Sequence, residues 1–138
     1  MTQIVDCKVE DAYNAVVETM KIPEWNPQVL TVIPTSSEAV EKGAQFVFKL
    51  KKIGNQTMEI TDLQPGKSVT YSPVSSMFAG GHQWSFSENN GKTQIDHTAE
   101  MSLKGVFLLL FPLIPLLNMM NKQITRSDAA SIQAHLEG

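Results

Sequence analysis

The sequence lacks the features on which several classes of protein depend. Its 138 residues include one cysteine, Cys7, so an internal disulfide is excluded. It contains no glycine-rich phosphate loop, no Gly-x-Ser-x-Gly segment and no Cys-x-x-Cys pair. The three histidines and Cys7 also lack the short, regular spacing of a zinc site. We therefore expect neither a metal nor another cofactor.

Positive charge is scarce as well, and no long hydrophobic run is present. The net charge is −3 and the isoelectric point is near 5.5, whereas nucleic-acid binding needs a clustered positive surface. The main apolar run, residues 106–117, has 12 residues including two prolines, but roughly 18 are needed to span a bilayer. No basic stretch followed by an apolar core opens the chain. These features predict a soluble, cytoplasmic protein that does not bind nucleic acid.

The last third of the chain is the part that predicts a long helix. Residues 118–136 contain no glycine or proline, and about 20 helical residues span roughly 30 Å, the width of a small domain. Pro115 suits the first helical position. One helical face, which we expect to be apolar in its first half and mixed in its second, carries Leu113, Leu117, Met120, Ile124, Asp128, Ser131 and His135.

From Val29 onward, apolar and polar residues alternate over about 75 residues, which predicts strands. The predicted strands are residues 29–35, 45–51, 56–63, 68–72, 82–87 and 92–103. The last two form a hairpin around Asn89-Asn90-Gly91, and residues 74–81 before them are predicted to be a loop. A short strand within residues 1–7 and a helix over residues 9–20 come first. A meander with one apolar face must be covered, and the long helix is the element left to cover it.

Several short segments stand in a characteristic order along these elements. They are Asp11-Ala12-Tyr13, Pro23-Glu24-Trp25-Asn26-Pro27, Gly43-Ala44-Gln45-Phe46, Glu59-Ile60-Thr61-Asp62-Leu63-Gln64-Pro65-Gly66-Lys67, Trp84-Ser85-Phe86-Ser87-Glu88, Gly91-Lys92-Thr93-Gln94-Ile95-Asp96-His97-Thr98, and a Leu/Pro-rich entry into the last helix. In order and spacing the chain resembles the START/Bet v1-like helix-grip superfamily, and within it the SRPBCC family of polyketide cyclase/dehydrase and lipid-transport proteins. The resemblance covers nearly the whole chain, although Cys7-Lys8 stands where the family often has a small residue and a proline.

The resemblance implies an α+β fold. An antiparallel, curved sheet of six to seven strands wraps on the long C-terminal helix, two short helices follow the first strand, and residues 1–138 form a single domain. The grip leaves a gap between sheet and helix, and methionine adapts well to such a gap. We predict a ligand cavity there, lined by Phe46, Phe48, Met58, Ile60, Tyr71, His82, Trp84, Phe86, His97, Met101, Leu117, Met120 and Ile124.

Two of these residues, His82 and His97, are polar groups on an apolar face. A structural role in which each is held by a hydrogen bond and a ligand-orienting or acid/base role are both open. A two-residue turn at Asn89-Asn90 places His82 opposite His97, whereas a longer loop places Trp84 opposite His97. Burial lowers a histidine pKa, so we expect both to be neutral at pH 7. Asp128 is expected at the rim, with a buried position facing the histidines as the alternative.

A mostly apolar cavity with a few polar groups predicts binding of a hydrophobic small molecule, such as a lipid, quinone, polyketide or aromatic metabolite. One alternative is a cyclase- or dehydratase-type enzyme that uses His97, His82 or Asp128 as acid or base. Another is a module that docks on a membrane surface or a partner, or associates with itself, through residues 106–117. Trp25, between two prolines, is expected to be a hydrophobic plug that pins the short helices, with a ligand platform as the alternative. Because the family contains binders and enzymes alike, the fold does not decide between them.

Overall fold

The computed structural model describes residues 1–35, 39–51, 54–74, 78–103 and 114–138, with side chains for all of these except 78–79, 101–103, 114–118 and 120–121. The chain begins with β1 (Thr2–Val5), α1 (Val9–Val17) and the 3₁₀ helix η1 (Thr19–Glu24). The strands β2 (Val29–Pro34), β3 (Gln45–Leu50), β4 (Gly54–Gln64), β5 (Ser68–Pro73), β6 (Phe78–Asn89) and β7 (Lys92–Leu103) follow, and α2 (Ile114–Glu137) comes last.

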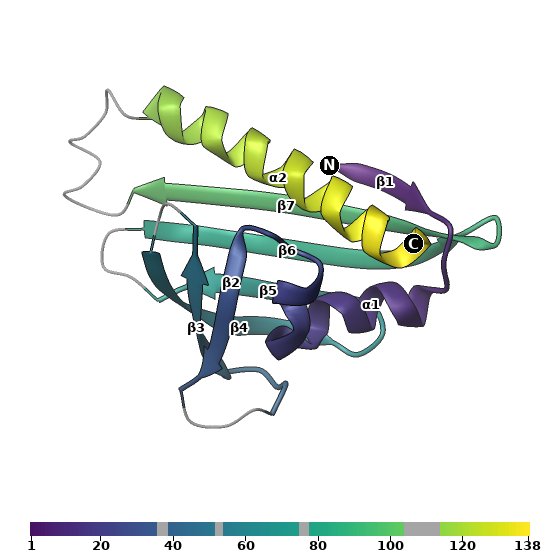
Figure 1. Cartoon of the computed structure of the whole chain (residues 1–138), viewed down its shortest axis with the longest axis horizontal. Coiled ribbons are helices and arrows are strands. Elements are labelled where there is room, and N and C mark those ends of the chain that lie inside the picture. The colour runs from purple at the N-terminus through teal and green to yellow at the C-terminus, as the bar shows by residue number, and fades with distance from the viewer. Residues whose placement is uncertain (36–38, 52–53, 75–77, 104–113) are drawn as a thin grey trace.

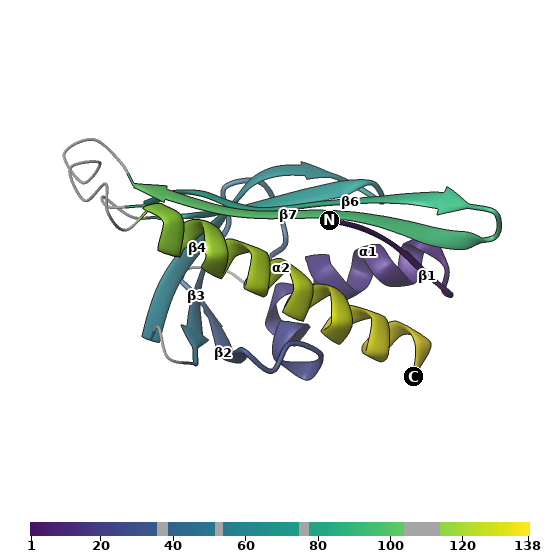
Figure 2. The same ribbon diagram turned by 90° about the horizontal axis from the view of Figure 1, so that it is seen from above.

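The strands form one antiparallel sheet in the order β1-β7-β6-β5-β4-β3-β2. Both α-helices lie on the same side of the sheet, and β2, β3 and β4 bend toward that side (Figures 1 and 2). The long helix α2 packs against β7 and β1, while α1 packs against β5, β6 and β7. This arrangement confirms the predicted α+β helix-grip fold, with seven strands and two short helices after the first.

The turn of the β6–β7 hairpin sets which side chains face α2. Asn90 has φ 53° and Gly91 has φ 80°, and two central residues with positive φ are what a two-residue type I′ turn requires. Asn89 therefore pairs with Lys92, and Trp84 lies opposite His97. Of the two predicted registers, the one that places Trp84 opposite His97 is found. A slip of one residue would turn the inward side chains outward.

The N-terminal helical region is divided where the sequence pattern predicted one helix. The α-helix ends at Val17, and Glu18 has a non-helical ψ of 76°. The chain then continues as η1, which contains Pro23, a residue that lacks a donor for a regular α-helix. Trp25 follows and is 7% exposed, with its indole Nε1 donating to the carbonyl of Ala15 at 2.8 Å. It acts as the predicted hydrophobic plug.

The buried face of α2 differs from the predicted stripe in its second half. Asp128, Ala129 and Ile132 are 4%, 3% and 0% exposed, whereas His135 is exposed. Ile132 belongs to the main hydrophobic core. Because the side of α2 that carries Ile132 faces the core, the side that carries His135 faces away from it. None of the helices in the described part of the chain combines the length and the hydropathy that a bilayer crossing requires.

The two consecutive glycines before the hairpin are in a strand, so the predicted loop over residues 74–81 is wrong at its end. β6 begins at Phe78 and includes Gly80 and Gly81. Gly81 has φ 137°, and a Cβ there would collide with the backbone carbonyl of Tyr71. Glycine thus permits a close approach of β5 and β6 that other residues prevent.

Replacement of Gly81 by alanine should destabilise the fold strongly. The added methyl group meets both an unfavourable φ and the Tyr71 carbonyl, so we expect Gly81→Ala to lower the free energy of unfolding by about 2 to 4 kcal/mol. Urea unfolding measures this change. Gly66→Ala is the control, because Gly66 also has a positive φ of 75° but open space around its Cα, and it should lose only about 1 kcal/mol. Equal losses would show that the close approach is unimportant.

Candidate functional site

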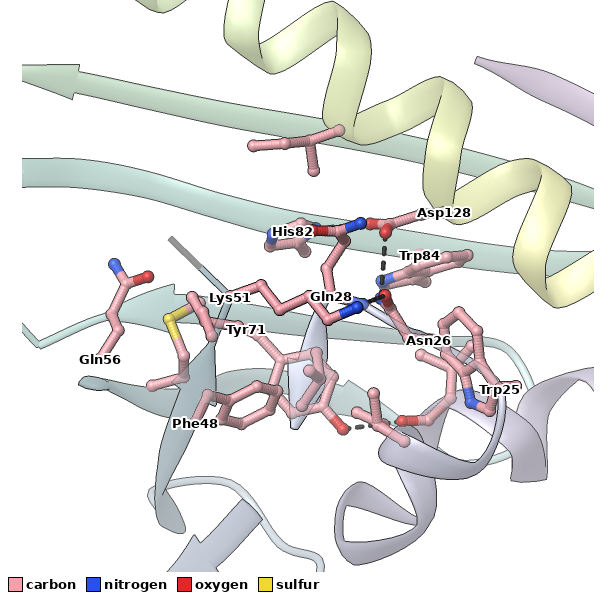
Figure 3. Close-up of a pocket in the computed structure, with 16 residues that line it drawn as sticks. Trp25, Asn26, Gln28, Phe48, Lys51, Gln56, Tyr71, His82, Trp84 and Asp128 are labelled. Carbon is pink, nitrogen blue, oxygen red and sulfur yellow. Dashed lines mark hydrogen bonds and ion pairs between the residues drawn. The ribbon is translucent and has the colours of Figure 1, made fainter. Parts of the chain in front are cut away.

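A cavity of about 160 Å³ lies between the inner face of the sheet, η1 and α2 (Figure 3). Its volume is close to that of an apolar cavity of roughly 150 Å³ that accommodates benzene. Its walls are mainly apolar and aromatic, with a few polar groups. The lining residues are Val16, Ile22, Trp25, Asn26, Gln28, Val29, Phe48, Leu50, Lys51, Gln56, Met58, Tyr71, His82, Trp84, Ile124 and Asp128.

The residues predicted to line the cavity fall into four groups. Those that line it are Phe48, Met58, Tyr71, His82, Trp84 and Ile124. Phe46, Ile60 and Phe86 are at most 5% exposed and belong to the core without lining the cavity. His97 lies behind His82 and borders a separate hollow between β7 and α2. The side chains of Met101, Leu117 and Met120 lie outside those described, so their role remains a prediction.

Several lining residues escaped the sequence analysis because they lie outside the regular strands. Asn26 and Gln28 follow η1, and Lys51 follows β3. Sequence periodicity identifies residues in helices and strands but not residues in loops, although the prolines around Asn26 indicate a segment of restricted conformation. Trp25 combines two roles, because the plug also lines the cavity and packs edge to face against Trp84, with ring centroids 6.0 Å apart.

Asp128 is buried, so the expectation of a rim carboxylate is wrong. Its side chain comes from α2 and reaches the end of the cavity beside His82 (Figure 3). Asn26 Nδ2 donates to Asp128 Oδ1 at 3.0 Å, and the backbone N–H of Gln28 donates to Asn26 Oδ1 at 3.1 Å. The Asn26 amide is therefore fixed at both ends. It holds Oδ1 in place and leaves Oδ2 directed toward the histidines.

The two histidines form a hydrogen-bonded pair. His82 Nδ1 and His97 Nε2 are 3.1 Å apart, and the rings meet edge to edge, with centroids 5.3 Å apart and planes 15° apart. The face of His97 stacks on Trp84 at 3.6 Å. The His97 side chain is 2% exposed, whereas that of His82 is 30% exposed and lines the cavity. His82 is thus the member of the pair that a ligand can reach.

Burial determines the protonation of this cluster. Desolvation lowers the pKa of His82, and it lowers the pKa of His97 further with help from nearby His82 and the N-terminal amine. Burial raises the pKa of Asp128 to about 7, partly opposed by the hydrogen bond from Asn26. Oδ2 of Asp128 lies 3.7 Å from His82 Nδ1 and 3.9 Å from His97 Nε2. Both histidines are therefore neutral at pH 7, and these contacts are not ion pairs.

Tyr71, a further polar residue that lines the cavity, is not a hydrogen-bond partner of the histidines. Its hydroxyl donates to the carbonyl of Val16 at 2.8 Å and shares a hydrogen bond with the Thr19 hydroxyl at 2.8 Å. Burial also raises its pKa. Tyr71 therefore links β5 to the N-terminal helices. Because its hydroxyl is engaged in these bonds, its ring is the part of the side chain that lines the cavity.

The cluster brings together three side chains of types that bind metals. The ligand atoms of His82, His97 and Asp128 lie within 4.8 Å of one another, although they are far apart in sequence. In a metal site the imidazole lone pairs converge on the ion, and the other ring nitrogen is held by an outer hydrogen bond. Here two ring nitrogens face each other, and His97 Nδ1 has no partner among the described residues. The geometry thus favours a hydrogen-bonded histidine pair over a metal site.

No protein-family model and no curated protein matches the sequence. Solved structures with the same architecture are numerous. Ara h 8.0201 superimposes with a TM-score of 0.76 at 12% identity, covering 99% of this chain and 94% of that protein. A START superfamily protein from Mycobacterium smegmatis gives a TM-score of 0.73 at 12% identity, with 99% and 94% covered. The di-domain ARO/CYC StfQ of the steffimycin biosynthetic pathway gives 0.73 at 19% identity, with 99% and 49% covered.

These similarities define the class of fold. The chain shares the helix-grip architecture of these structures, as the sequence resemblance predicted. At sequence identities of 12% to 19%, structural similarity establishes the fold but not the activity. The neighbours include both a di-domain ARO/CYC protein and proteins of other kinds, so function must be inferred from the site itself.

The protonation of the cluster predicts how stability depends on pH. Because both histidine pKa values are lowered, the unfolded chain takes up protons below about pH 6.5 that the folded chain refuses, and stability falls as pH falls toward about 4. Asp128 acts in the opposite sense, because the folded chain keeps its proton up to about pH 7. His82→Gln should therefore flatten the rise in unfolding free energy between pH 4.5 and 6.5, and Asp128→Asn should steepen it.

Urea unfolding at half-unit pH steps tests this difference between variants. Each removed proton changes the slope by about 1.4 kcal/mol per pH unit. His135→Gln, a substitution on the exposed side of α2, is the control for the loss of a histidine. Profiles of wild type, His82→Gln and Asp128→Asn that run parallel would contradict the assigned protonation.

Proposed function

We propose that this protein binds a hydrophobic small molecule in the cavity between the sheet and α2. The supporting observation is the cavity itself, whose walls are apolar and aromatic and whose polar groups gather around Asp128 and His82. A ligand gains affinity from apolar burial and a fixed orientation from a few placed polar groups. Lipids, quinones, polyketides and other aromatic metabolites match this description. Molecules larger than a single ring require the cavity to widen.

Binding can be observed without labels, because both tryptophans of the chain, Trp25 and Trp84, line the cavity. Native mass spectrometry of freshly purified protein tests for a ligand that copurifies. Titration with a panel of fatty acids, quinones and flavonoids should change the tryptophan fluorescence and raise the melting temperature. A panel without any binding member, together with protein that carries no small molecule, would contradict the proposal.

Filling the cavity should abolish binding. Ile124 lines the cavity from α2, so Ile124→Trp should weaken the affinity for any panel member at least tenfold while the melting temperature falls little. Calorimetric titration measures the affinity. Ile33→Trp is the matched control, since Ile33 is 59% exposed on β2 and does not line the cavity. Unchanged affinity in Ile124→Trp would place the ligand elsewhere.

An acid/base enzyme is the second candidate, favoured by one observation. His82 faces the cavity and is hydrogen-bonded to His97, so a proton can pass between them. The distance from Asp128 Oδ2 to His97, 3.9 Å, requires an intervening water or a small movement. If turnover occurs, a copurified compound should be altered by wild-type protein and not by His82→Gln. Recovery of an unchanged compound would contradict the enzyme hypothesis and leave ligand binding as the proposed function.

Docking to a membrane or self-association through residues 106–117 remains a prediction. Residues 104–113 lie outside the described part of the chain, as do the side chains of residues 114–117. Liposome flotation and light scattering test this hypothesis directly, since an exposed apolar run promotes both forms of association.

A further inference from the structure

We propose that the polar end of the cavity recognises a carbonyl oxygen, so that the ligands are apolar ketones, quinones or enones bound with the oxygen toward His82 and Asp128. This inference rests on the proposed function and names the class of ligand. It is built from hydrogen-bond partners of the His82, His97 and Asp128 cluster, which together present two donors and no net charge to the cavity.

The first step is the position of the proton on His97. Its Nδ1 is buried and has no hydrogen-bond partner among the described residues. Orphaned buried N–H groups are rarer in proteins than orphaned acceptors, and the N-terminal amine of Met1, bonded to the His97 carbonyl, adds positive charge nearby. Nδ1 is therefore the unprotonated nitrogen. The proton is on Nε2, which donates to His82 Nδ1 at 3.1 Å.

The second step follows for His82. Its Nδ1 accepts from His97, so a neutral ring carries its proton on Nε2. Nε2 has no partner among the described side chains, and it is not among their buried unpartnered atoms. The His82 side chain is 30% exposed, and His82 lines the cavity. His82 thus offers an N–H donor to whatever occupies the cavity.

The third step concerns Asp128. Its Oδ1 accepts from Asn26, and the His82 nitrogen nearest Oδ2 already accepts a hydrogen bond from His97. Neutral histidines supply no positive charge to hold a carboxylate, and burial raises the pKa of Asp128 to about 7. The acid proton therefore belongs on Oδ2. Asp128 becomes the second donor, in the way that a carboxylic acid in an apolar site can stay protonated to donate a hydrogen bond.

His82 Nε2 and Asp128 Oδ2 are two neutral donors from residues that line the same end of the cavity, and such donors suit an oxygen with two lone pairs and no full charge. A carboxylate would bring an unpaired charge into an apolar space, which is costly. Among the described residues, no lysine or arginine forms an ion pair with the cluster. Tyr71 on β5 is engaged with Val16 and Thr19, the Met1 amine is bonded to the backbone of His97, and Lys51 lines the cavity from an exposed position after β3. A hydrocarbon, in turn, would leave both donors unpaired.

A matched pair of probes tests this inference. Acetophenone and α-methylstyrene have nearly the same shape, but the second replaces the carbonyl oxygen with a methylene group, and both approach the size the cavity accepts. Wild-type protein at pH 6 should bind acetophenone about tenfold more tightly, as two hydrogen bonds imply. The ¹³C resonance of carbonyl-labelled acetophenone should also move downfield on binding, as it does in hydrogen-bonding solvents.

Variants separate the two donors from the apolar walls. His82→Phe and Asp128→Leu should each reduce the preference for acetophenone several-fold without weakening the binding of α-methylstyrene. Asp128→Asn should retain the preference, because its amide can accept from Asn26 and still donate to the ligand. Above pH 7 the preference should decline in wild type, where Asp128 ionises, and persist in Asp128→Asn. His135→Phe, on the exposed face of α2, is the control.

The outcomes distinguish the inference from the function on which it rests. Equal affinity of wild-type protein for the two probes, or a bound carbonyl resonance like that in cyclohexane, overturns carbonyl recognition and leaves hydrophobic binding intact. A preference that survives both His82→Phe and Asp128→Leu also overturns it, because the oxygen is then bound elsewhere. Binding of neither probe, together with a panel that does not bind, contradicts the proposed function as well.

Discussion

The burial of one carboxyl group is the constraint on which the architecture of this site depends. Asp128 is the only buried acid among the described residues, and removing a carboxyl from water is costly unless it is hydrogen-bonded or neutral. The structure supplies both conditions, through the Asn26 amide and through an apolar setting that favours the protonated form. Because Asn26 follows η1 and the histidines lie on the β6–β7 hairpin, the group joins three parts of the chain.

The hairpin register is what brings the histidines to that group. The turn at Asn90-Gly91 places Trp84 opposite His97, so that the indole covers the face of His97. Trp84 also contacts Trp25, which closes the neighbouring wall of the cavity. One turn conformation therefore determines a hydrogen-bonded pair, its aromatic cover and part of the cavity wall. These are long-range consequences of a local φ preference.

Much of the fold could be predicted from the sequence, because it follows from local periodicity. Alternation located the strands, the absence of Gly and Pro located α2, and both agree with the structure within a few residues for most elements. Gly80 and Gly81 were assigned to a loop because glycine normally interrupts strands. Here it is required by the close approach to Tyr71, which only the paired strand reveals.

The site was less predictable than the fold. Period two identifies which residues face inward, but Phe46 and Phe48 share that face and only Phe48 lines the cavity. The distinction depends on how β2 to β4 curve and on the rotation of α2, neither of which is local. Asp128 was assigned to the correct helix face, yet its burial depends on Asn26, a loop residue 102 positions away. Sequence periodicity gives no information about a partner so far away in the chain.

In the proposed binding of a small molecule, the polar end and the apolar walls of the cavity contribute different properties. The walls provide affinity through burial, which is not directional, whereas the donors at His82 and Asp128 provide orientation. These two donors come from β6 and α2, so their separation changes whenever α2 moves relative to the sheet. A ligand much larger than the present 160 Å³ must displace α2 or the wall. If it displaces α2, Asp128 moves away from His82 and the paired donors are lost. Selection by size and selection by polarity are therefore coupled through the position of a single helix.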